Sequence, residues 1–444
     1  MSVQPDCTYI IPPNRDMALL NGTLQLFEPT SARGLRMSID YFFRSLAQDQ
    51  RERAIGIILS GTGSDGTLGV RAIKGEGGMV MVQAPESTEY DGMPQSAIAT
   101  GMVDFVLPPE EMPAQLFAYV DHVYGVGKRT PVVKQRPKVE ATLTKICVVL
   151  RAQTGHDFSQ YKQNTVVRRV ERRMALQQIE QPDAYLRFLQ QNSAEVAALF
   201  NDLLIGVTSF FRDPDAFTAL QEEVLPRLFA ETPPDVTVRF WVCGCSTGEE
   251  AYSIAIVVQE YLEKSRQFNK VQIFATDIDA RAINVARAGL YPASIAADIT
   301  PERLARHFSL EPGNAYYRIK KSIRDMLVFS EQDVIKDPPF SRVDLISCRN
   351  LLIYMNAELQ RKVIALFHYA LNPKGVLFLG TSETVTEQTV LFTVLDRKWK
   401  IYLRRQDGVR PPAPASVMAV FPRMAGSVPD GPERADTRSK SSDD

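Results

Sequence analysis

The sequence predicts an α/β protein whose C-terminal half contains a parallel β-sheet. From about residue 236 to 404, short apolar runs alternate with amphipathic stretches, the pattern of strands joined by crossover helices. Residues 141–230 show helical spacing of apolar residues. Residues 1–120 contain short apolar runs typical of buried strands and one helical stretch. We therefore expect a parallel-sheet domain preceded by a helical subdomain and an incomplete doubly wound α/β unit.

Composition narrows the class of protein. The 444 residues are 45% hydrophobic and 23% charged, as in globular proteins with a core. The net charge of -1 gives no overall field that would attract nucleic acid. No apolar run has the length of a membrane span and the N-terminus lacks a secretory signal, so we expect a cytoplasmic protein without membrane insertion. Five scattered cysteines and four histidines make a disulfide framework or a metal site unexpected.

The N-terminal unit, residues 1–120, has few recognisable elements. Residues 53–61 and 77–83 are expected strands, and residues 38–47 form an expected helix. The first strands of a doubly wound sheet have no counterpart, which would leave sheet edges exposed. The Gly-, Pro- and Lys-rich stretch that follows predicts a linker over residues 121–140.

Two domains and a tail follow the linker. A helical subdomain is expected over residues 141–230 and a parallel-sheet domain over residues 231–405. Residues 406–444 are rich in Pro, Ser and Asp and are expected to be disordered. The expected strands of the sheet domain are 238–244, 271–277, 342–348, 375–381 and 398–405.

The turn after the first expected strand of the sheet domain favours ligand binding. Residues 244–248 (GCSTG) let a ligand approach the backbone and leave N–H groups of the following helix free. Glu249 and Glu250 in the first helical turn would repel a phosphate, so they suit hydroxyl groups or a cation. Asp277 ends the second strand, where an acidic residue accepts ribose hydroxyls. The alternative is a structural turn whose carboxylates stabilise the helix dipole.

Polar residues also follow the third expected strand of this domain. Arg349 and Asn350 stand just beyond residues 342–348, outside the carboxyl end of a strand, where α/β sheets bind ligands. Tyr354 lies four residues further on. The alternative is an exposed loop with Tyr354 as a half-buried core aromatic.

Residues 141–404 resemble the chemotaxis receptor methyltransferase (CheR-type) family. Six motifs carry the resemblance in order: VTSFFRDPDAF (207–217), CSTGEEAYSIA (245–255), ATDIDARAINVARAGLY (275–291), FSEQDV (329–334), VDLISCRNLLIYM (343–355) and LNPKGVLFLGTSE (371–383). The resemblance implies a class I S-adenosylmethionine-dependent methyltransferase with a Rossmann-like sheet and an N-terminal helical subdomain.

The same resemblance implies a reaction and the residues that perform it. The family transfers a methyl group from S-adenosylmethionine to glutamate side chains of the cytoplasmic signalling helices of chemoreceptors, leaving S-adenosylhomocysteine. The matching motifs assign contacts to Thr208 and Arg212 at the methionine end, Glu250, Asp277 at the ribose, Asp333 and Val334 beside the adenine, and Arg349, Asn350 and Tyr354 at the transfer site. Arg212, Arg349 and Tyr354 are the candidate catalytic residues.

The chemistry of this reaction makes few demands on the protein. A glutamate carboxylate, with a reference pKa of about 4.3, is already ionised at neutral pH and needs no general base. The enzyme mainly has to align the reacting atoms. Either Arg212 or Arg349 is suited to hold a carboxylate through a charge-assisted fork, and the sequence does not decide between them.

A helix with four arginines is expected over residues 164–179. In the methyltransferase family the corresponding helix is part of the face that docks the receptor, which makes Arg168, Arg169, Arg172 and Arg173 candidates for steering acidic receptor helices. The alternative is an ordinary solvated helix face.

Residues 8–107 resemble the C-terminal part of the chemotaxis receptor methylesterase (CheB-type) family. The matching stretches are TYIIPPNRDMAL (8–19), IGIILSGTGSDGTLG (55–69) and DGMPQSAIATGMVDFVLP (91–108). The aspartate of that family's Ser–His–Asp triad matches Asp65. Residues 1–121 contain no histidine, and such a triad needs an imidazole base, so no esterase activity is expected. Asp65 is instead expected to stabilise its Gly-rich loop.

The sequence offers three alternatives to receptor methylation. One is a non-catalytic scaffold that senses S-adenosylmethionine, and another is part of a bifunctional methylesterase/methyltransferase whose esterase half is incomplete here. A dinucleotide-dependent oxidoreductase is disfavoured because the sequence has no G-x-G-x-x-G turn and places Glu249 and Glu250 where a pyrophosphate would bind.

Overall fold

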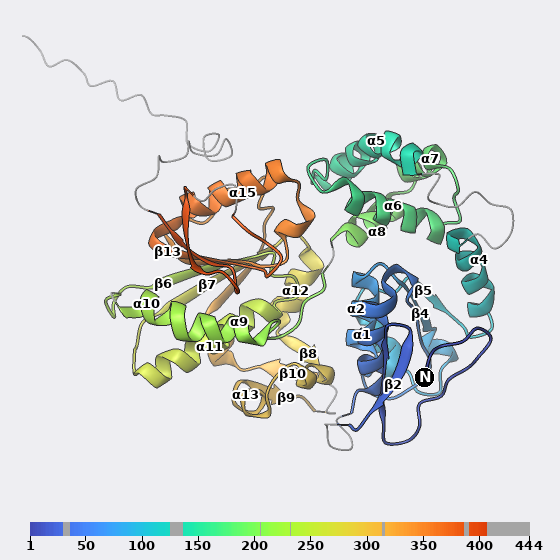
Figure 1. The fold of residues 1–444 in the computed structure, drawn as a ribbon, viewed down its shortest axis with the longest axis horizontal. Helices are drawn as coiled ribbons and strands as arrows, with labels where there is room; N and C mark the ends of the chain where they lie inside the picture. Colours follow the sequence, from blue (N-terminus) through green and yellow to red (C-terminus); the bar gives the residue numbers. More distant parts are fainter. Residues whose placement is uncertain are drawn as a thin grey trace, which may run out of the picture.

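Figure 1 shows the computed structural model of the chain, in which three units lie side by side. The structure describes residues 1–29, 36–124, 136–204, 206–230, 232–312, 316–385 and 390–405. Most of the expected linker, 125–135, and the expected tail, 406–444, lie outside the described residues. Helices α4 (Met112–Tyr124) and α5 (Arg136–Thr154) extend into the ends of the range expected to be linker.

The N-terminal unit contains a three-stranded parallel sheet in the order β3–β4–β5. Its other elements are an antiparallel hairpin and three further helices. The bounds are β1 (Asp16–Leu20), β2 (Thr23–Phe27), α1 (Ser38–Gln50), β3 (Ile55–Ile58), α2 (Thr67–Gly75), β4 (Met79–Gln83), α3 (Gly92–Ala99) and β5 (Phe105–Leu107). The expected strands and helix are confirmed, and β3 is an edge strand of the described sheet.

Both faces of this small sheet are covered. One face packs against helices of its own unit, where Val80 and Val82 meet Phe43 of α1 and Ile73 of α2. The other face packs against α4 and against the C-terminal end of α6 (Gln163–Leu176), a helix of the next unit. The apolar core of the N-terminal unit is therefore shared with the helical subdomain.

The helical subdomain consists of α5, α6, α7 (Pro182–Gln191) and α8 (Ser193–Leu203). Apolar side chains at helical spacing, among them Ile146, Val170, Leu189 and Leu199, form its core. The helices between 214 and 230, expected to belong here, instead pack on the sheet of the third unit. They are α9 (Pro214–Ala219), a π-helical turn over Leu220–Val224, and α10 (Leu225–Ala230).

The third unit is a seven-stranded sheet in the order β11–β7–β6–β12–β13–β15–β14. The first five strands are parallel, and β15 and β14 pair antiparallel at the far edge. The bounds are β6 (Val238–Cys243), β7 (Val271–Asp277), β11 (Leu327–Glu331), β12 (Val343–Cys348), β13 (Leu371–Leu379), β14 (Phe392–Asp396) and β15 (Ile401–Arg404). The expected Rossmann-like sheet with parallel central strands is confirmed. The sequence reading missed β11 and β14, the two edge strands, whose half-exposed residues give a weak apolar pattern.

Helices cover both faces of the large sheet (Figure 1). α11 (Glu249–Ser265) and α12 (Ala280–Ala288) lie on one face together with α9 and α10, and α15 (Ala357–Ala370) lies on the other. A small antiparallel sheet follows α12, with strand order β8–β10–β9. Its elements are β8 (Leu290–Pro292), α13 (Pro301–His307), β9 (Phe308–Leu310), β10 (Tyr316–Ile319) and α14 (Lys321–Arg324). Among the described helices, none combines the length and the apolar character that crossing a bilayer requires.

Candidate functional site: a cleft at the carboxyl ends of the strands

The carboxyl ends of β6, β7 and β12 meet at one edge of the large sheet. The turn after β6 begins at Gly244, which has a φ of +73°, and a side chain there would press on Leu351. Ser246 also takes a positive φ, +48°. Its N–H donates to Oδ2 of Asp277, 2.7 Å away at the end of β7. This hydrogen bond joins the turn after β6 to the end of β7, at the edge of the sheet where a ligand would bind.

A cleft opens at this edge, and it brings together seven of the residues predicted from sequence. They are Thr208, Arg212, Glu250, Asp277, Arg349, Asn350 and Tyr354. A second, smaller cavity adjoins the cleft and shares Tyr161, Asp277 and Leu351 with it. The predicted pair Asp333 and Val334 lines this second cavity. Residues from distant motifs therefore surround one continuous space, with Asp277 where the two parts meet.

Asp277 is held by the backbone on both carboxylate oxygens. Besides the Ser246 contact, its Oδ1 accepts the N–H of Asp279 at 2.9 Å. Burial raises the pKa of Asp277, with the backbone hydrogen bonds acting in the opposite direction. The carboxylate keeps a fixed orientation toward the cleft that it lines, which suits the recognition of hydroxyl groups.

The smaller cavity contains a histidine that the sequence reading did not assign to the site. His156, in the segment between α5 and α6, places Nδ1 at 2.7 Å from Oδ2 of Asp333 and Nε2 at 3.1 Å from the hydroxyl of Tyr161. Burial opposes ionisation of Asp333, but the contact with His156 outweighs it and holds the pKa of this carboxyl below its usual value. A single histidine 177 positions before its partner gives no spacing signal, so only the fold reveals it.

Arg349 is buried and engaged by protein groups. Its guanidinium donates to the carbonyl of Arg212 at 2.9 Å, to Oδ2 of Asp213 at 2.7 Å and to Oε2 of Glu250 at 3.4 Å. It also lies over the rings of Phe217 and Phe378. These contacts use the positive charge of Arg349 to hold Glu250 and the segment before α9.

Arg212 differs from Arg349 in exposure and in partners. It is half-buried, lines the cleft, and donates from Nη1 to the carbonyl of Val207 at 3.1 Å. Among the described residues, no ion pair with a carboxylate occupies its guanidinium. Of the two arginines between which the sequence did not decide, Arg212 is the one with donors available to a ligand carboxylate.

Glu383 is a second residue of the site that sequence reasoning missed. Asn350 has a φ of +62°, a strained conformation for a residue with a side chain. The carboxylate of Glu383 accepts the N–H groups of Asn350 at 2.9 Å and of Gly380 at 2.7 Å. Burial raises the pKa of Glu383 despite these bonds. Glu383 thus fixes the turn that presents Asn350 to the cleft.

Tyr354 lies half-buried on the wall of the cleft. Its carbonyl accepts the N–H of Lys162, so the helical subdomain is tied to this wall. Burial raises the pKa of the Tyr354 hydroxyl, with the nearby Arg169 and Arg212 acting in the opposite direction. The hydroxyl is therefore a hydrogen-bond donor at neutral pH and not a base.

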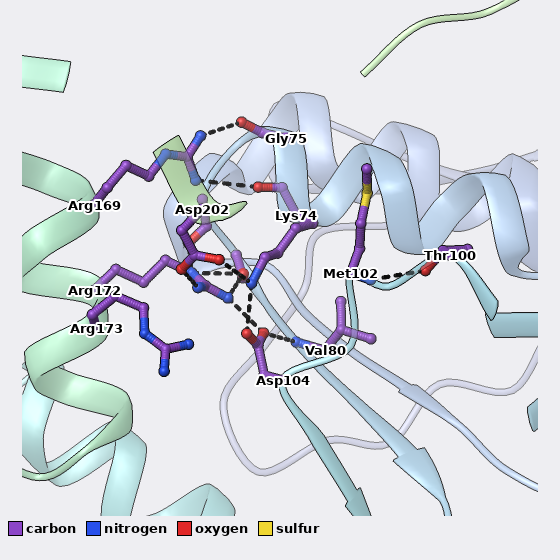
Figure 2. A network of polar contacts seen from close by, with 12 residues as sticks. Lys74, Gly75, Val80, Thr100, Met102, Asp104, Arg169, Arg172, Arg173 and Asp202 are labelled. Atoms are coloured by element: carbon purple, nitrogen blue, oxygen red, sulfur yellow. Dashed lines mark hydrogen bonds and ion pairs between the residues drawn. The ribbon is translucent and has the colours of Figure 1, made fainter. Parts of the chain in front are cut away.

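The four arginines of α6 have different surroundings, and Figure 2 shows three of them, Arg169, Arg172 and Arg173. Arg168 is exposed. Arg169 and Arg172 are buried, and both donate to backbone carbonyls of the N-terminal unit. Arg173 forms a two-pronged ion pair with Glu195 of its own subdomain. The expectation of a four-residue docking face fails for Arg169 and Arg172, because the N-terminal unit covers them.

Asp65 has a defined structural role. Its two carboxylate oxygens accept the N–H groups of Ile39 at 3.0 Å and Asp40 at 2.9 Å, at the start of α1. A carboxylate at a helix N-terminus satisfies unpaired donors and interacts favourably with the helix dipole. This role resembles the structural one expected from sequence, although the carboxylate acts on a helix and not only on its own loop.

The charges that line the cleft suit a cationic ligand with hydroxyl groups. Glu250, Asp277 and Asp279 contribute three carboxylates against the guanidinium groups of Arg212 and Arg349. The Arg349 charge is already paired with Glu250 and Asp213, so among the described residues that line the cleft the carboxylates outnumber the guanidinium groups. A nucleoside with a sulfonium and an amino acid end matches this set of groups, whereas a pyrophosphate does not.

The parallel sheet, the glycine turn after β6 and this cleft define an S-adenosylmethionine-dependent methyltransferase. Residues 206–401 match the family of the CheR methyltransferase, SAM binding domain, and residues 141–204 match the CheR methyltransferase, all-alpha domain. The chain belongs to the CheR methyltransferase family. Residues 1–116 match the CheB methylesterase family.

Relatives extend over one or both of these parts. Chemotaxis protein methyltransferase 2 of Vibrio cholerae is 32% identical over 54% of this chain and 84% of its own length, and a chemotaxis protein methyltransferase of Salmonella typhimurium is 31% identical over 55% and 84%. An uncharacterised 104.1 kDa protein of Rhodobacter capsulatus is 37% identical over 93% of this chain, which spans 45% of that protein. The CheB methylesterase catalytic domain of Thermotoga maritima is 31% identical over 24% of this chain and 59% of that domain, with a TM-score of 0.23.

Proposed function

We propose that this chain methylates glutamate side chains on the cytoplasmic signalling helices of chemoreceptors, with S-adenosylmethionine as the methyl donor. One observation carries the proposal: Arg212, Glu250, Asp277, Arg349 and Tyr354, from four separate motifs, surround one cleft. The chemotaxis protein methyltransferases of Vibrio cholerae and Salmonella typhimurium support it as relatives that the chain covers almost throughout.

The residues of the cleft divide the binding tasks. Asp277 would accept from the ribose hydroxyls, and Asp333 and Val334 would flank the adenine in the smaller cavity. Thr208 would contact the methionine end, Glu250 would be a further cofactor contact, and Asn350 would line the transfer site. Arg212 holds a carboxylate with its available donors, while Arg349 acts as a positioning residue that fixes Glu250.

The transfer needs alignment more than proton chemistry. When bound, S-adenosylmethionine supplies a methyl group that the sulfonium already activates. An ionised substrate carboxylate would need no general base, so no residue of the cleft would have to move a proton. The contribution of this chain is to hold both reactants in line, with the Tyr354 hydroxyl as a donor at the transfer site.

Receptor recognition and location are part of the proposal. An acidic receptor helix would approach in the cytoplasm, where signalling helices lie. Docking at α6 rests on Arg168, the member of the arginine group that is exposed in this structure.

Esterase activity is not expected from the N-terminal unit. Residues 1–121 of this chain contain no histidine, and Asp65 spends both carboxylate oxygens on the start of α1. The check is methanol release from a methylated receptor fragment: release catalysed by this chain would contradict the expectation.

The experiment that tests the main proposal uses purified full chain, methyl-labelled S-adenosylmethionine and receptor signalling fragments from a bacterium that encodes the chain. The readout is label released as methanol by mild alkali, which reports carboxyl methyl esters. We compare Asp277→Ala with Asp325→Ala, which removes an exposed carboxylate that pairs with Lys321 outside the cleft.

Base-labile label that disappears in Asp277→Ala and persists in Asp325→Ala supports the proposal. Binding of S-adenosylhomocysteine without label on any receptor fragment would contradict transfer to receptors and favour a sensing scaffold. Absence of both binding and label would overturn the assignment of the cleft.

A further inference from the structure

A buried ion pair joins the N-terminal unit to the start of α11. Arg71 of α2 is 8% exposed, and its Nη1 lies 3.0 Å from Oε1 of Glu249 and 3.4 Å from Oγ1 of Thr247. Glu249 is 2% exposed, and its other oxygen accepts the hydroxyl of Thr247 at 2.6 Å. The described side-chain partners of the Glu249 carboxylate are therefore Thr247 and Arg71. Arg71 is the charged partner, and it belongs to the N-terminal unit.

Thr247 and Glu249 belong to the turn that forms one wall of the cleft. Their neighbours Ser246 and Glu250 line it directly. The carbonyl of Thr247 also accepts the hydroxyl of Tyr291 at 2.7 Å. Arg71 thus holds two side chains of this turn, each next to a residue that lines the cofactor cleft, and Ser246 in the same turn has a strained conformation.

The N-terminal unit also contacts the opposite wall. Gly75, at the end of α2, lies so close to Val207 that any side chain at position 75 would overlap it. Met102 lies at ordinary contact distance from the position that a side chain on Gly206 would occupy. Gly206 and Val207 line the cleft and follow directly on the helical subdomain. A cavity of about 150 Å³ lies between these contacts, bounded by Arg71, Val207 and Thr247 among others.

A buried network fixes α2 against the helical subdomain (Figure 2). Lys74 lies 2.7 Å from Asp104 and 2.9 Å from Asp202, and Arg172 pairs with the same two carboxylates. The two cations and two anions balance, so the network stabilises one arrangement of α2, α6, α8 and the segment before β5. Displacement of α2 would leave buried charges without partners.

We infer that the N-terminal unit is a positioning element of the transferase, in which Arg71 holds the 244–250 turn against the 206–208 wall and so sets the affinity for the methyl donor. The inference rests on the proposed function for the identity of the ligand. Arg71 is a positioning residue because it acts through Thr247 and Glu249 and does not line the cleft itself.

The test is calorimetric titration of the full chain with S-adenosylhomocysteine. Arg71→Met removes the ion pair with Glu249 and leaves that carboxylate buried and unpaired. The double variant Arg71→Met, Glu249→Gln removes the unpaired charge as well. Arg71→Lys keeps a charge that can reach Glu249. Arg44→Ala is the matched control, because the Arg44–Asp298 ion pair joins the same two units, and neither of its residues lines the cleft.

We expect Arg71→Met and the double variant to weaken binding by about tenfold, the loss expected for a lost charged hydrogen bond, and Arg71→Lys to restore most of it. Arg44→Ala should lower the thermal midpoint without changing the affinity. In the methylation assay the KM for S-adenosylmethionine should rise while kcat at saturation stays close to that of the unaltered chain.

Wild-type affinity in the double variant would overturn the inference, since the effect of Arg71→Met would then come from the unpaired Glu249. Equal losses in Arg44→Ala and Arg71→Met would overturn it as well. The binding measurement separates this inference from the proposed function. If the chain binds S-adenosylhomocysteine but methylates no receptor, the proposed function is wrong, and the effect of Arg71 on affinity can still be measured.

Discussion

The imidazole of His156 and the carboxylate of Asp333 are joined by a 2.7 Å contact that connects the helical subdomain to the segment after β11. The His156 side chain is 3% exposed and packs edge-on against Phe158 at 4.6 Å between ring centroids. Residues of two units therefore line the smaller cavity: His156 belongs to the helical subdomain and Asp333 to the unit of the large sheet.

Replacement of His156 by Ala should weaken binding of S-adenosylhomocysteine by roughly three- to tenfold, because Asp333 loses a buried hydrogen bond and its loop loses a tether. Calorimetry of the full chain measures the change. Tyr161→Phe serves as the comparison: it deletes the hydroxyl that faces Nε2 of His156 and leaves His156–Asp333 intact, so its effect should be smaller. Equal affinities of His156→Ala and the unaltered chain would contradict the prediction.

Arg212 and Arg349 should respond differently to the same substitution. Arg349→Met leaves the partly buried carboxylates of Glu250 and Asp213 without their cation, so the free energy of unfolding should fall by about 2 kcal/mol. Arg212→Met removes no described ion pair, so the free energy of unfolding should stay unchanged. The transition-state stabilisation derived from kcat/KM should fall by about 2 kcal/mol, the contribution of a charged hydrogen bond to a ligand. Urea denaturation and methylation kinetics together decide. A stable Arg349→Met protein beside an unstable Arg212→Met protein would reverse the assignment.

The network of Lys74, Arg172, Asp104 and Asp202 should make the chain sensitive to acid. Burial opposes ionisation of both carboxyls, but the charges of Arg172 and Lys74 outweigh it and hold their pKa values below the usual range. The unfolded chain takes up protons near pH 4, before the folded chain does, so the stabilisation is complete above that pH and is lost below it.

Asp202→Asn tests this network, since it leaves two buried cations with one carboxylate. We expect about 3 kcal/mol less stability at neutral pH and a weaker loss of stability on going from pH 5 to pH 3. Urea denaturation across that range is the measurement, with the exposed Asp325→Asn as the control. An unchanged acid profile in Asp202→Asn would show that the network does not control acid stability.

Asp40 should produce the opposite dependence in the N-terminal unit. Burial raises its pKa to about 7; its Oδ1 accepts the N–H of Gly69 at 2.6 Å, and its Oδ2 has no described partner. The folded chain holds a proton that the unfolded chain releases near pH 4, so stability should fall as the pH rises from about 4 to 7. Asp40→Asn should flatten this decline, as followed by thermal denaturation. If stability falls with pH in Asp40→Asn as steeply as in the unaltered chain, another titratable group causes the fall.

Motif reasoning located most of the cleft because its residues follow buried strands. The position after a parallel strand predicts a place at the ligand-binding edge, and this sufficed for Asp277, Arg349 and Asn350. The same logic could not find His156 or Glu383, since neither follows a strand at that edge with a recognisable spacing. Their roles come from hydrogen bonds to Asp333 and Asn350, which only the folded chain brings within reach.

The arginines of α6 show the limit of what sequence periodicity can predict. The helical pattern correctly set Val166, Val170 and Met174 on the core face and the cations elsewhere. It gave no information on what faces those cations. Arg169 and Arg172 donate to carbonyls 94 and 95 positions earlier in the chain, a pairing that depends on how two units pack.

The sequence by itself therefore determined the class of the sheet, its central strands and part of the set of side chains around the cleft, because these follow from local patterns of apolar residues, glycines and carboxylates. The tertiary structure alone decided that α6 is covered, that Arg71 reaches Glu249 and that Arg349 is spent on internal ion pairs. Such contacts arise between segments far apart in the chain, where burial and charge balance, and no local pattern, select the partner.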